Sequence, residues 1–518
     1  MIRKNLLLIV SIVSLSFCGS VSFSMSKSQQ IIANEYVEDE WDGSTASSFE
    51  SGSGTLDNPY IIAHASQLSY LRTSLSSNNY YANKYISLTT NINLKQIQWN
   101  GIGSGTLAGS FKGTFLGNDK IVRGLSVNAA ASYRGFFNSI SGEARDLQVE
   151  GTITGGGSSY KGYGLFAGVS YGILNNCSSK GDVDVIGTYV GGLVGVNAGK
   201  DMTNCSYLSG TTNGTNMVGG VTGYNMQYSS KIGKLINCKN YGTITAKDYL
   251  TENYSGIGGI VGVCGSNTSI TGCINYGEVI GEGKAIGGTG GIVGNNFNSS
   301  IIDCENQGLI KGKEYVGGIV GLSRNASLVK GSINKGKIVG SISVAGIVGY
   351  SRMFIEECDN QGEIEADISN ISYWIGGITG MLGSNLHLKK CSNSGYVHGL
   401  GSLDGGVGGI VGSNYNSLVE DCNNSGLVQG MYRVAGIVGY AQSTNGIVYN
   451  CINSGDFKSI AKYGTVSLGG IVGYNQASII YCINNGHYIV NENVEMYGYI
   501  VGYDTVGDSG VYNNINNV

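Results

Sequence analysis

The chain has 518 residues, of which 86 are glycine and one is proline, and 41% are hydrophobic. Glycine at this level without a three-residue period excludes collagen, and the steady supply of Ile, Val and Tyr argues against a disordered chain. The formal net charge is -4, only 13% of residues are charged and no basic block occurs, so the sequence lacks the electrostatic footprint of a protein that binds nucleic acid or an anionic membrane surface. We therefore expect an ordered protein with no nucleic-acid partner.

The first 24 residues have the layout of a secretory signal peptide. Arg3 and Lys4 precede a mostly apolar run over residues 6–17, and small residues follow. This layout predicts a protein that is secreted or displayed at the cell surface. Cys18 is a candidate for a lipid anchor, although the bulky Phe17 stands where such signals use a small residue. No later run of apolar residues is long enough for a transmembrane helix.

Residues 25–40 read as a linker, and residues 41–75 read as an N-terminal cap segment. A helical pattern occurs only over residues 63–74, with Leu68 and Leu71 able to cover the first coil of a repeat structure. A cap makes physical sense because an exposed end of stacked strands invites aggregation. Residues 76–163 are expected to form irregular first coils.

A glycine-rich hexapeptide recurs along the rest of the chain, residues 164–518. Eleven copies, preceded by degenerate forms at Gly135 and Gly164, begin at Val190, Val218, Ile257, Thr289, Val316, Val344, Ile375, Val407, Val434, Leu468 and Tyr497. The second glycine position recurs at intervals of 27 to 39 residues from Gly164 onward. Short β-type runs between Gly, Asn and Ser turns at this period predict an all-β parallel β-helix, a β-solenoid of about 11 or 12 coils with roughly three short strands per coil. The repeated glycines are then scaffold and not a phosphate-binding loop.

The copy at residues 316–321, "VGGIVG", suggests which side chains face inward. If this stretch were one extended strand, Ile319 would share a face with Gly317 and Gly321, and Val316 and Val320 would share the other. We expect the Ile319 column to point inward. The glycines would then leave space in a narrow cross-section or permit corner dihedral angles.

Two further columns follow from the shared motif Cys-x-Asn-x-Gly. Ten of the 12 cysteines occupy one repeat position, which predicts a ladder of buried free thiols in preference to disulfides or a metal site. These are Cys177, Cys205, Cys238, Cys273, Cys304, Cys358, Cys391, Cys422, Cys451 and Cys482. The asparagines predict a hydrogen-bonded amide ladder. They are Asn240, Asn275, Asn306, Asn334, Asn360, Asn393, Asn424, Asn453 and Asn484.

Departures from the repeat are the place to look for a ligand site. The interval from the motif glycine to the next hexapeptide is 10 residues between Gly308 and Gly318 but 17 between Gly242 and Gly259. Such insertions are expected to line one corner of the solenoid. They carry aromatic side chains that are candidates for stacking on sugars or anchoring a protein partner, although single exposed aromatic residues are ordinary. The candidates are Tyr249, Tyr254, Tyr373, Trp374 and Tyr463.

The repeated "GGIVG" resembles the GLUG motif of bacterial secreted and cell-surface proteins. The stretches "WDGSTASSFESGSGTLDNPYIIAHASQLSYLR" and "FKGTFLGNDKIVRGLSV" resemble the segment that accompanies this motif. The resemblance implies a right-handed coil and an adhesin-like surface protein. GLUG repeats also occur beside the catalytic part of immunoglobulin A-cleaving metallopeptidases, but His64, His387, His398 and His487 form no H-E-x-x-H zinc motif.

Two functions remain open at this point. The first is a noncatalytic scaffold, with no cofactor or metal, that binds host, matrix or glycan ligands through the loops of one corner. The alternative is a polysaccharide-degrading enzyme of the pectate-lyase-like class, which would need clustered carboxylates. Its candidate residues do not recur as an acidic column in neighbouring coils; they are Glu356, Glu357, Glu363, Glu365 and Asp367. The final stretch "VYNNINNV" stops inside a repeat. We therefore also expect that self-association can cover the C-terminal edge.

Overall fold

A computed structural model describes residues 38–518 except for 247–254, 282–286, 326, 367–372, 400–404, 462–465, 490–495, 507–509, 513 and 518. The part from Glu38 to Val518 is one compact unit. The predicted signal peptide, Cys18 and most of the predicted linker lie outside the described residues. In the described part of the chain, no helix has the length and apolar character needed to cross a membrane.

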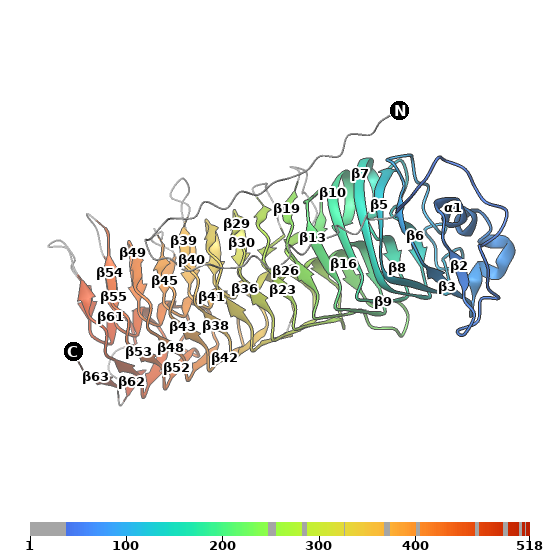
Figure 1. The fold of residues 1–518 in the computed structure, drawn as a ribbon. Coiled ribbons are helices and arrows are strands. Elements are labelled where there is room, and N and C mark those ends of the chain that lie inside the picture. The colour runs from blue at the N-terminus through green and yellow to red at the C-terminus, as the bar shows by residue number, and fades with distance from the viewer. Residues whose placement is uncertain are drawn as a thin grey trace, which may run out of the picture. The chain divides into compact units, whose positions relative to one another are not determined.

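The compact unit is a parallel β-solenoid of about 14 turns, which confirms the predicted fold class (Figure 1). One face is a separate sheet of 13 strands, hereafter the second sheet, and the remaining strands belong to one wrapped sheet. The second sheet consists of β6 (Phe137–Ile140), β8 (Ala167–Ser170), β11 (Val194–Ala198), β16 (Thr222–Met226), β21 (Val261–Cys264), β26 (Val293–Asn296), β31 (Val320–Ser323), β36 (Val348–Ser351), β41 (Thr379–Leu382), β46 (Val411–Asn414), β51 (Val438–Ala441), β56 (Val472–Asn475) and β61 (Val501–Asp504). The predicted count of 11 or 12 coils was therefore too low.

A regular coil contains five short strands, and not the three that were predicted. One coil runs through β30 (Glu314–Gly317), β31, β32 (Leu328–Lys330), β33 (Ile333–Asn334) and β34 (Ile338–Gly340). The hexapeptide crosses a corner, because Gly317 ends β30 and Val320 begins β31. Strand alternation therefore does not apply across it. Ile319 points inward as predicted, but Val316 and Val320 are fully buried as well.

The second glycine of the hexapeptide is required by space. A Cβ atom on Gly318 would lie 2.1 Å from the carbonyl oxygen of Gly346 in the next coil and 2.5 Å from the amide carbon of Asn334. The last copy has Tyr499 at this position, and no described coil stacks its backbone beyond that residue. The sequence predicted space in a narrow cross-section or special corner dihedral angles as the reason for the glycines, but at Gly318 the reason is the close approach of the next coil, and its φ is not in the left-handed region.

The asparagine column forms the predicted ladder. Each Nδ2 donates to the Oδ1 of the next asparagine at 2.7 to 2.9 Å, from Asn240 through to Asn484. The same Nδ2 also donates to the carbonyl of the glycine two residues later, as from Asn334 to Gly336 at 2.9 Å. The buried amides are thus satisfied along the axis, which is the condition for keeping polar groups in a core.

The cysteine column is buried, and the 11 cysteines among the described residues are free thiols. Each thiol of the column donates to the carbonyl two residues earlier at 3.2 to 3.6 Å. Cys264 lies in the adjacent asparagine-rich column of the second sheet, between Asn225 and Asn296. Burial raises its pKa to about 12, so it stays protonated at neutral pH.

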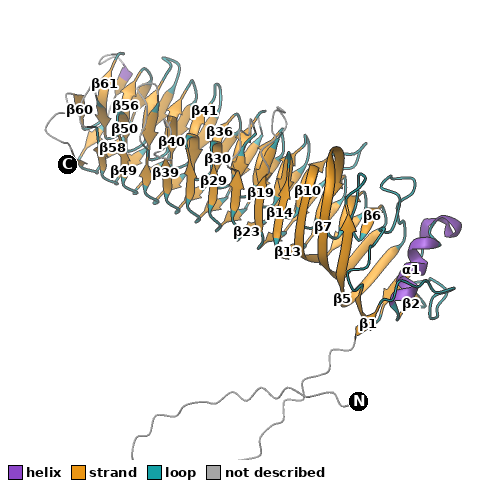
Figure 2. Cartoon of the chain, turned by 90° about the horizontal axis from the view of Figure 1, so that it is seen from above, coloured by secondary structure: helices purple, strands orange, loops and turns teal. Residues whose placement is uncertain are grey.

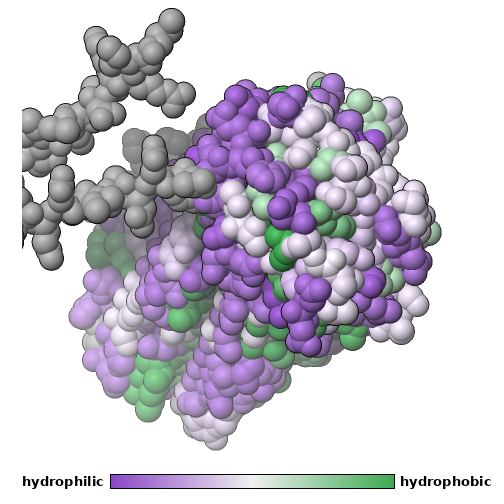
Figure 3. All heavy atoms as spheres, turned by 45° about the vertical axis from the view of Figure 1, so that its right-hand side comes forward, coloured by the Kyte–Doolittle hydropathy of each residue, from purple (hydrophilic) through white to green (hydrophobic). Residues whose placement is uncertain are grey.

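The N-terminal end carries the predicted cap (Figure 2). Helix α1 (Ala65–Thr73) is followed by the 3-10 helix η1 (Ser76–Tyr81), and the short strands here are β1 (Glu38–Glu40), β2 (Tyr60–Ile62), β3 (Tyr85–Leu88) and β4 (Asn91–Asn93). Leu68 and Leu71 are fully buried, as predicted. Strand β1 pairs with β4, so the solenoid already begins inside the predicted linker. Figure 3 shows mostly hydrophilic residues on the surface at this end, with smaller apolar patches between them.

The first coils contain longer strands than the regular coils, and the pairing of these strands includes register shifts. Three long strands, β5 (Thr114–Asn128), β7 (Glu143–Tyr163) and β10 (Ser178–Gly191), pair in parallel with one another. Aromatic rings fill the core beneath them, and the second sheet already begins at β6. The second sheet therefore already runs through coils that precede residue 164, and these coils use phenylalanine in place of the glycine and asparagine motifs.

Candidate functional site

The predicted insertions share one corner of the solenoid. They fall between β19 (Thr243–Ala246) and β20 (Gly256–Gly258), β39 (Ile364–Ala366) and β40 (Tyr373–Gly376), β44 (Val397–His398) and β45 (Gly406–Gly408), and β54 (Phe457–Ser459) and β55 (Ser467–Gly469). The flanking strands stack in parallel from coil to coil. The shared corner is therefore confirmed.

The structure describes two of the five candidate residues that were predicted at this corner. Tyr249, Tyr254 and Tyr463 lie outside the described residues. Tyr373 and Trp374 begin β40, with ring centroids 6.0 Å apart. Trp374 has a positive φ of 45° and is partly buried, and its indole Nε1 has no hydrogen-bond partner among the described residues. The structure therefore places this pair at the start of a strand and not within an inserted loop.

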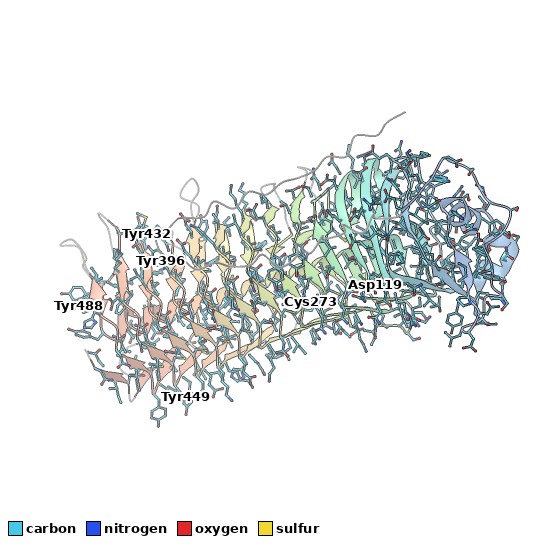
Figure 4. The ribbon with its side chains drawn as sticks, in the orientation of Figure 1. Asp119, Cys273, Tyr396, Tyr432, Tyr449 and Tyr488 are labelled. Atoms are coloured by element: carbon cyan, nitrogen blue, oxygen red, sulfur yellow. The ribbon has the colours of Figure 1, made fainter. Side chains whose placement is uncertain are left out.

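Two further tyrosines, one before β44 and one before β50 (Arg433–Ala435), were not among the predicted candidates. Figure 4 labels Tyr396 and Tyr432 on the upper side of the solenoid, whereas Tyr449 projects from the lower side. The Tyr396 hydroxyl donates to Gln429 Oε1 at 2.9 Å, and its ring stacks on His398 at 5.7 Å. Burial lowers the pKa of His398. Tyr432 lies in a short interval, from Gly426 to Gly436, whereas Tyr396 directly follows Gly395, the start of an interval that carries an insertion.

The outward face of the second sheet carries a column of alternate residues, hereafter the outer column. Its register is fixed by the strand pairing from coil to coil. The column runs through Val169, Val196, Tyr224, Val263, Asn295, Leu322, Tyr350, Met381, Ser413, Tyr440, Tyr474 and Tyr503. Strand alternation directs these side chains away from the main core. Six of them are partly or well exposed, namely Tyr224, Tyr350, Met381, Tyr440, Tyr474 and Tyr503, whereas Val169, Val196, Val263, Asn295, Leu322 and Ser413 are buried.

Aromatic contacts strengthen the outer column at three places. Tyr224 stacks with Tyr189 at 5.2 Å near the first coils. Tyr350 meets Tyr315 edge to face at 5.6 Å in the middle of the column. Further along, the ring of Tyr474 lies 5.2 Å from that of Tyr440 and 5.0 Å from that of Tyr503. The guanidinium of Arg433 lies over the Tyr440 ring at 4.0 Å and over the Tyr474 ring at 4.7 Å. Such pairs hold the rings in place.

A groove with a volume of about 570 Å³ lies beside the middle of the outer column. Tyr350 and Met381 of the column line it. Its other lining residues come from the turns that follow the second-sheet strands: Arg324, Asn325, Arg352, Gly383, Ser384, Asn385, Leu386 and Tyr415. The volume is in the range of small-molecule sites.

A second column of residues, one of which is a glycine, lies beside the outer column and lines the groove. Arg324, Arg352, Gly383 and Tyr415 each stand two residues after a member of the outer column, so they follow one another coil by coil. We call the space over Gly383, between Arg352 and Tyr415, the notch. Arg352 and Tyr415 are exposed, Tyr415 by 50%. Their backbones are two coil spacings apart, about 10 Å.

Cations flank the carboxylates that the enzyme alternative would use. Lys337 pairs with Glu363 at 3.5 Å and also with Glu365. Lys330 pairs with Glu357 at 3.3 Å and with Glu356 at 3.7 Å. Asp367 lies outside the described residues, and among those described no three His, Cys, Asp or Glu side chains group as metal ligands. In this arrangement the carboxylates act as one half of ion-paired ladders between coils.

No family model and no curated protein sequence matches the chain. Among solved structures, the chain is similar to a Bacteroides ovatus protein named provisionally as an immunoglobulin A1 protease. The two share 18% sequence identity, the match covers 61% of this chain and 80% of that chain, and the TM-score is 0.34. A likeness of this size supports no statement about the function of the chain.

The notch was missed in the sequence, although a signal for it exists. Arg324 and Arg352 occur in "GLSRN" and "GYSRM", the same position of two consecutive repeats. The following repeats read "GMLGS" and "GSNYN", which put Gly383 and Tyr415 at that position. Aligning the repeats by the hexapeptide and reading this column down would have shown the pattern of two arginines, a gap and a tyrosine.

Proposed function

We propose that the chain is a noncatalytic, adhesin-like scaffold of the GLUG-repeat kind that binds a glycan or matrix ligand outside the cell. The observation that carries the proposal is the groove beside the outer column, because it gathers aromatic, amide and guanidinium groups on a rigid β-surface. Such groups recognise polar ligands by stacking and hydrogen bonding without any chemical step.

Two features of the sequence support an extracellular role. The N-terminal pattern is that of an exported protein. The hexapeptide repeats resemble those of surface stalks. Lipid attachment at Cys18 and self-association through the C-terminal edge stay predictions.

Rigid display is the mechanism that we propose. The amide ladder and the close glycine stacking fix each coil relative to the next, so surface groups in neighbouring coils keep their spacing before a ligand arrives. Little conformational entropy is then lost on binding. The corner insertions stay a second candidate for ligand binding, and the predicted Tyr249, Tyr254 and Tyr463 of these insertions lie outside the described residues.

The test is binding of residues 25–518 to a glycan array and to a panel of matrix proteins, with product release measured on the same polysaccharides. We expect retained ligand and no release of reducing or unsaturated ends. A variant with Tyr373 and Trp374 changed to Ala reports on the corner, and Tyr415→Ala reports on the groove. Release of sugar products would replace the scaffold with the polysaccharide-degrading alternative, and absence of any binding would remove the proposed function.

A further inference from the structure

The first coils contain a pocket with a volume of about 450 Å³, hereafter the first-coil pocket. Its polar lining consists of Gln98, Asn100, Asn128 and Arg134. We propose that this pocket binds one acidic sugar unit, whose carboxylate pairs with Arg134 and whose hydroxyl groups meet the side-chain amides. The inference rests on the proposed function for the class of ligand. It adds a separate site, because residues 324–415 line the groove and residues 98–134 line this pocket.

The first-coil pocket lies at the corner that carries insertions in later coils. Asn128 ends β5 and pairs with Thr154, and this column continues in register, coil by coil, to Glu365 of β39. Arg134 pairs with Tyr163, and that column continues to Ile375 of β40. Residues 129–133 therefore occupy, in an early coil, the corner at which a ligand surface was predicted.

Arg134 stands in a column that buries uncharged side chains in the following coils. Tyr163, Val190 and Val218 come next in the column, and each is fully buried. Residues in register in parallel strands face the same side of the sheet, so Arg134 points toward the inside of its coil. Burial raises the pKa of Tyr163 to about 12, and the nearby positive charge of Arg134 opposes this rise. A cation at such a position is costly unless an anion pairs with it.

The Arg134 guanidinium is open to such an anion. The side chain makes no hydrogen bond or ion pair with another described residue. It is partly exposed, and none of its nitrogen atoms is both buried and unpaired. Among the described residues, no Asp or Glu lines the pocket. A carboxylate that accepts two parallel hydrogen bonds from the guanidinium supplies the missing partner.

The rest of the lining favours a sugar over an acidic peptide. Asn100 and Asn128 are exposed, and their side chains make no hydrogen bond within the described part of the chain. A side-chain amide both donates and accepts, which matches the hydroxyl groups of a sugar. The apolar side chains at the opening are only the methyl groups of Ala130 and Ala131, so the pocket offers little to a large peptide side chain.

The wall of the pocket is held in place without a ligand. Trp99 is fully buried, its Nε1 donates to the Phe136 carbonyl at 3.0 Å, and its ring stacks on Phe136 at 5.8 Å. The Asn138 side chain, in β6, donates to the Asn100 carbonyl at 2.8 Å. The segment around Trp99 is thus tied to the start of the second sheet, and little conformational entropy is lost when a ligand binds.

Binding of residues 25–518 to matched probes, measured by isothermal titration calorimetry, tests the inference. The probes are digalacturonic acid, the same disaccharide with its carboxylates reduced to alcohols, and diglutamate. Arg134→Gln removes the charge, and Arg134→Val introduces the residue type of the later coils. Lys180→Gln removes one positive charge at an exposed position of β10 and serves as the matched control. Circular dichroism melts report the stability of each variant.

We expect digalacturonic acid to bind about tenfold or more tightly than its reduced form, since hydrogen bonds to a charged group contribute on that scale. Both Arg134 variants should lose this preference, and Lys180→Gln should keep it. Arg134→Val should melt at the same temperature as the natural protein or higher, because valine fills this column in later coils. Loss of the preference without loss of stability separates a binding role of Arg134 from a structural one.

Other outcomes overturn the inference. Equal binding of the acidic and the reduced disaccharide contradicts the acidic site, as does a preference that both Arg134 variants keep. Equal losses in Lys180→Gln and Arg134→Gln show attraction by net charge alone, and diglutamate that binds as tightly as digalacturonic acid excludes the sugar assignment. If these probes fail while the array and matrix panel show another ligand, only the acidic site fails; if those panels are empty too, the proposed function fails with it.

Discussion

The first coils and the regular coils fill the same kind of cross-section in two ways. Under β5 and β7 the core is aromatic, with Phe111, Phe115, Phe136 and Phe137 fully buried. In the regular coils the core consists of Val, Ile and Cys, with the asparagine ladder at one turn and close-packed glycines at a corner. Large rings interlock across coils at few points, whereas small residues repeat one interaction in each coil. The first arrangement ends a stack and the second continues it.

The aromatic core is the place where one substitution should cost most. Phe137 lies 4.9 to 5.8 Å from the rings of Phe111, Phe115, Phe136 and Phe166. We expect Phe137→Ala to lower the free energy of unfolding by about 4 kcal/mol, measured by urea denaturation, because it leaves a cavity between rings. Phe354→Ala, at a 38% exposed site, is the matched control. Similar losses at the two sites would contradict the contrast between core and surface.

The glycine stacking of the regular coils should be nearly as sensitive. Gly318→Ala places a methyl group against the Gly346 carbonyl and Asn334, and we expect a loss of about 3 kcal/mol from overpacking. Gly157→Ala is the control, because a Cβ atom on Gly157 would meet only the side chain of Tyr160, at 3.3 Å. It should cost clearly less in the same denaturation experiment. Equal costs would show that the second glycine position has no special spatial demand.

Substitution in the asparagine ladder should have the next largest effect on the free energy of unfolding. Asn334→Ala removes the bond to Asn360 and leaves the donor of Asn306 and the carbonyl of Gly336 without their partner. We expect a loss of about 2 kcal/mol, the scale for unsatisfied buried polar groups. Hydrogen exchange should show faster opening of the coils on both sides of the substitution. Asn423→Ala, at an exposed strand position beside the ladder residue Asn424, should change neither measurement.

The cysteine column should tolerate a small change. Ser332 occupies the column between Cys304 and Cys358, and its hydroxyl donates to the Lys330 carbonyl at 3.2 Å. We expect Cys304→Ser to cost less than about 1 kcal/mol, since the hydroxyl can make the same bond. A loss as large as that of Asn334→Ala would mean that the column depends on sulfur itself.

The smallest effect is expected in the cap and depends on pH. His64 Nδ1 lies 3.0 Å from Asp39 Oδ1, and this hydrogen bond raises the pKa of the exposed His64 above its usual 6.5. A raised pKa in the folded state stabilises the protein fully below the unfolded pKa, and this stabilisation is lost as the pH rises through the folded value. Melting temperatures should therefore fall slightly more between pH 6 and 8.5 in the natural protein than in His64→Gln. An identical pH dependence in both would contradict a role for the pair.

The sequence was sufficient to predict whatever repeats with the period of a coil. The Asn334 ladder, the buried Cys304 column, the scaffold role of Gly318 and the helix over Leu68 and Leu71 all followed from spacing and residue type. The corner within the hexapeptide did not, because alternation gives no sign of where a strand bends. The first coils were also undercounted, since rings such as Phe136 replace the motif on which the count relied. The notch escaped because it is a single gap in an external column, where no core constraint repeats.

The in-register stacking also fixes distances along the axis of the solenoid. Because every coil contributes one step of about 4.8 Å along the axis, the notch stands at a distance from the cap that is set by the number of coils between them. Losing or gaining one whole repeat between Gly192 and Gly318 would move the notch by one such step and leave its own residues untouched. The distance of the notch from the cap and the residues that line it can then change independently in this chain. A change in the number of repeats alters the distance, and substitution of the few residues around Gly383 alters the lining.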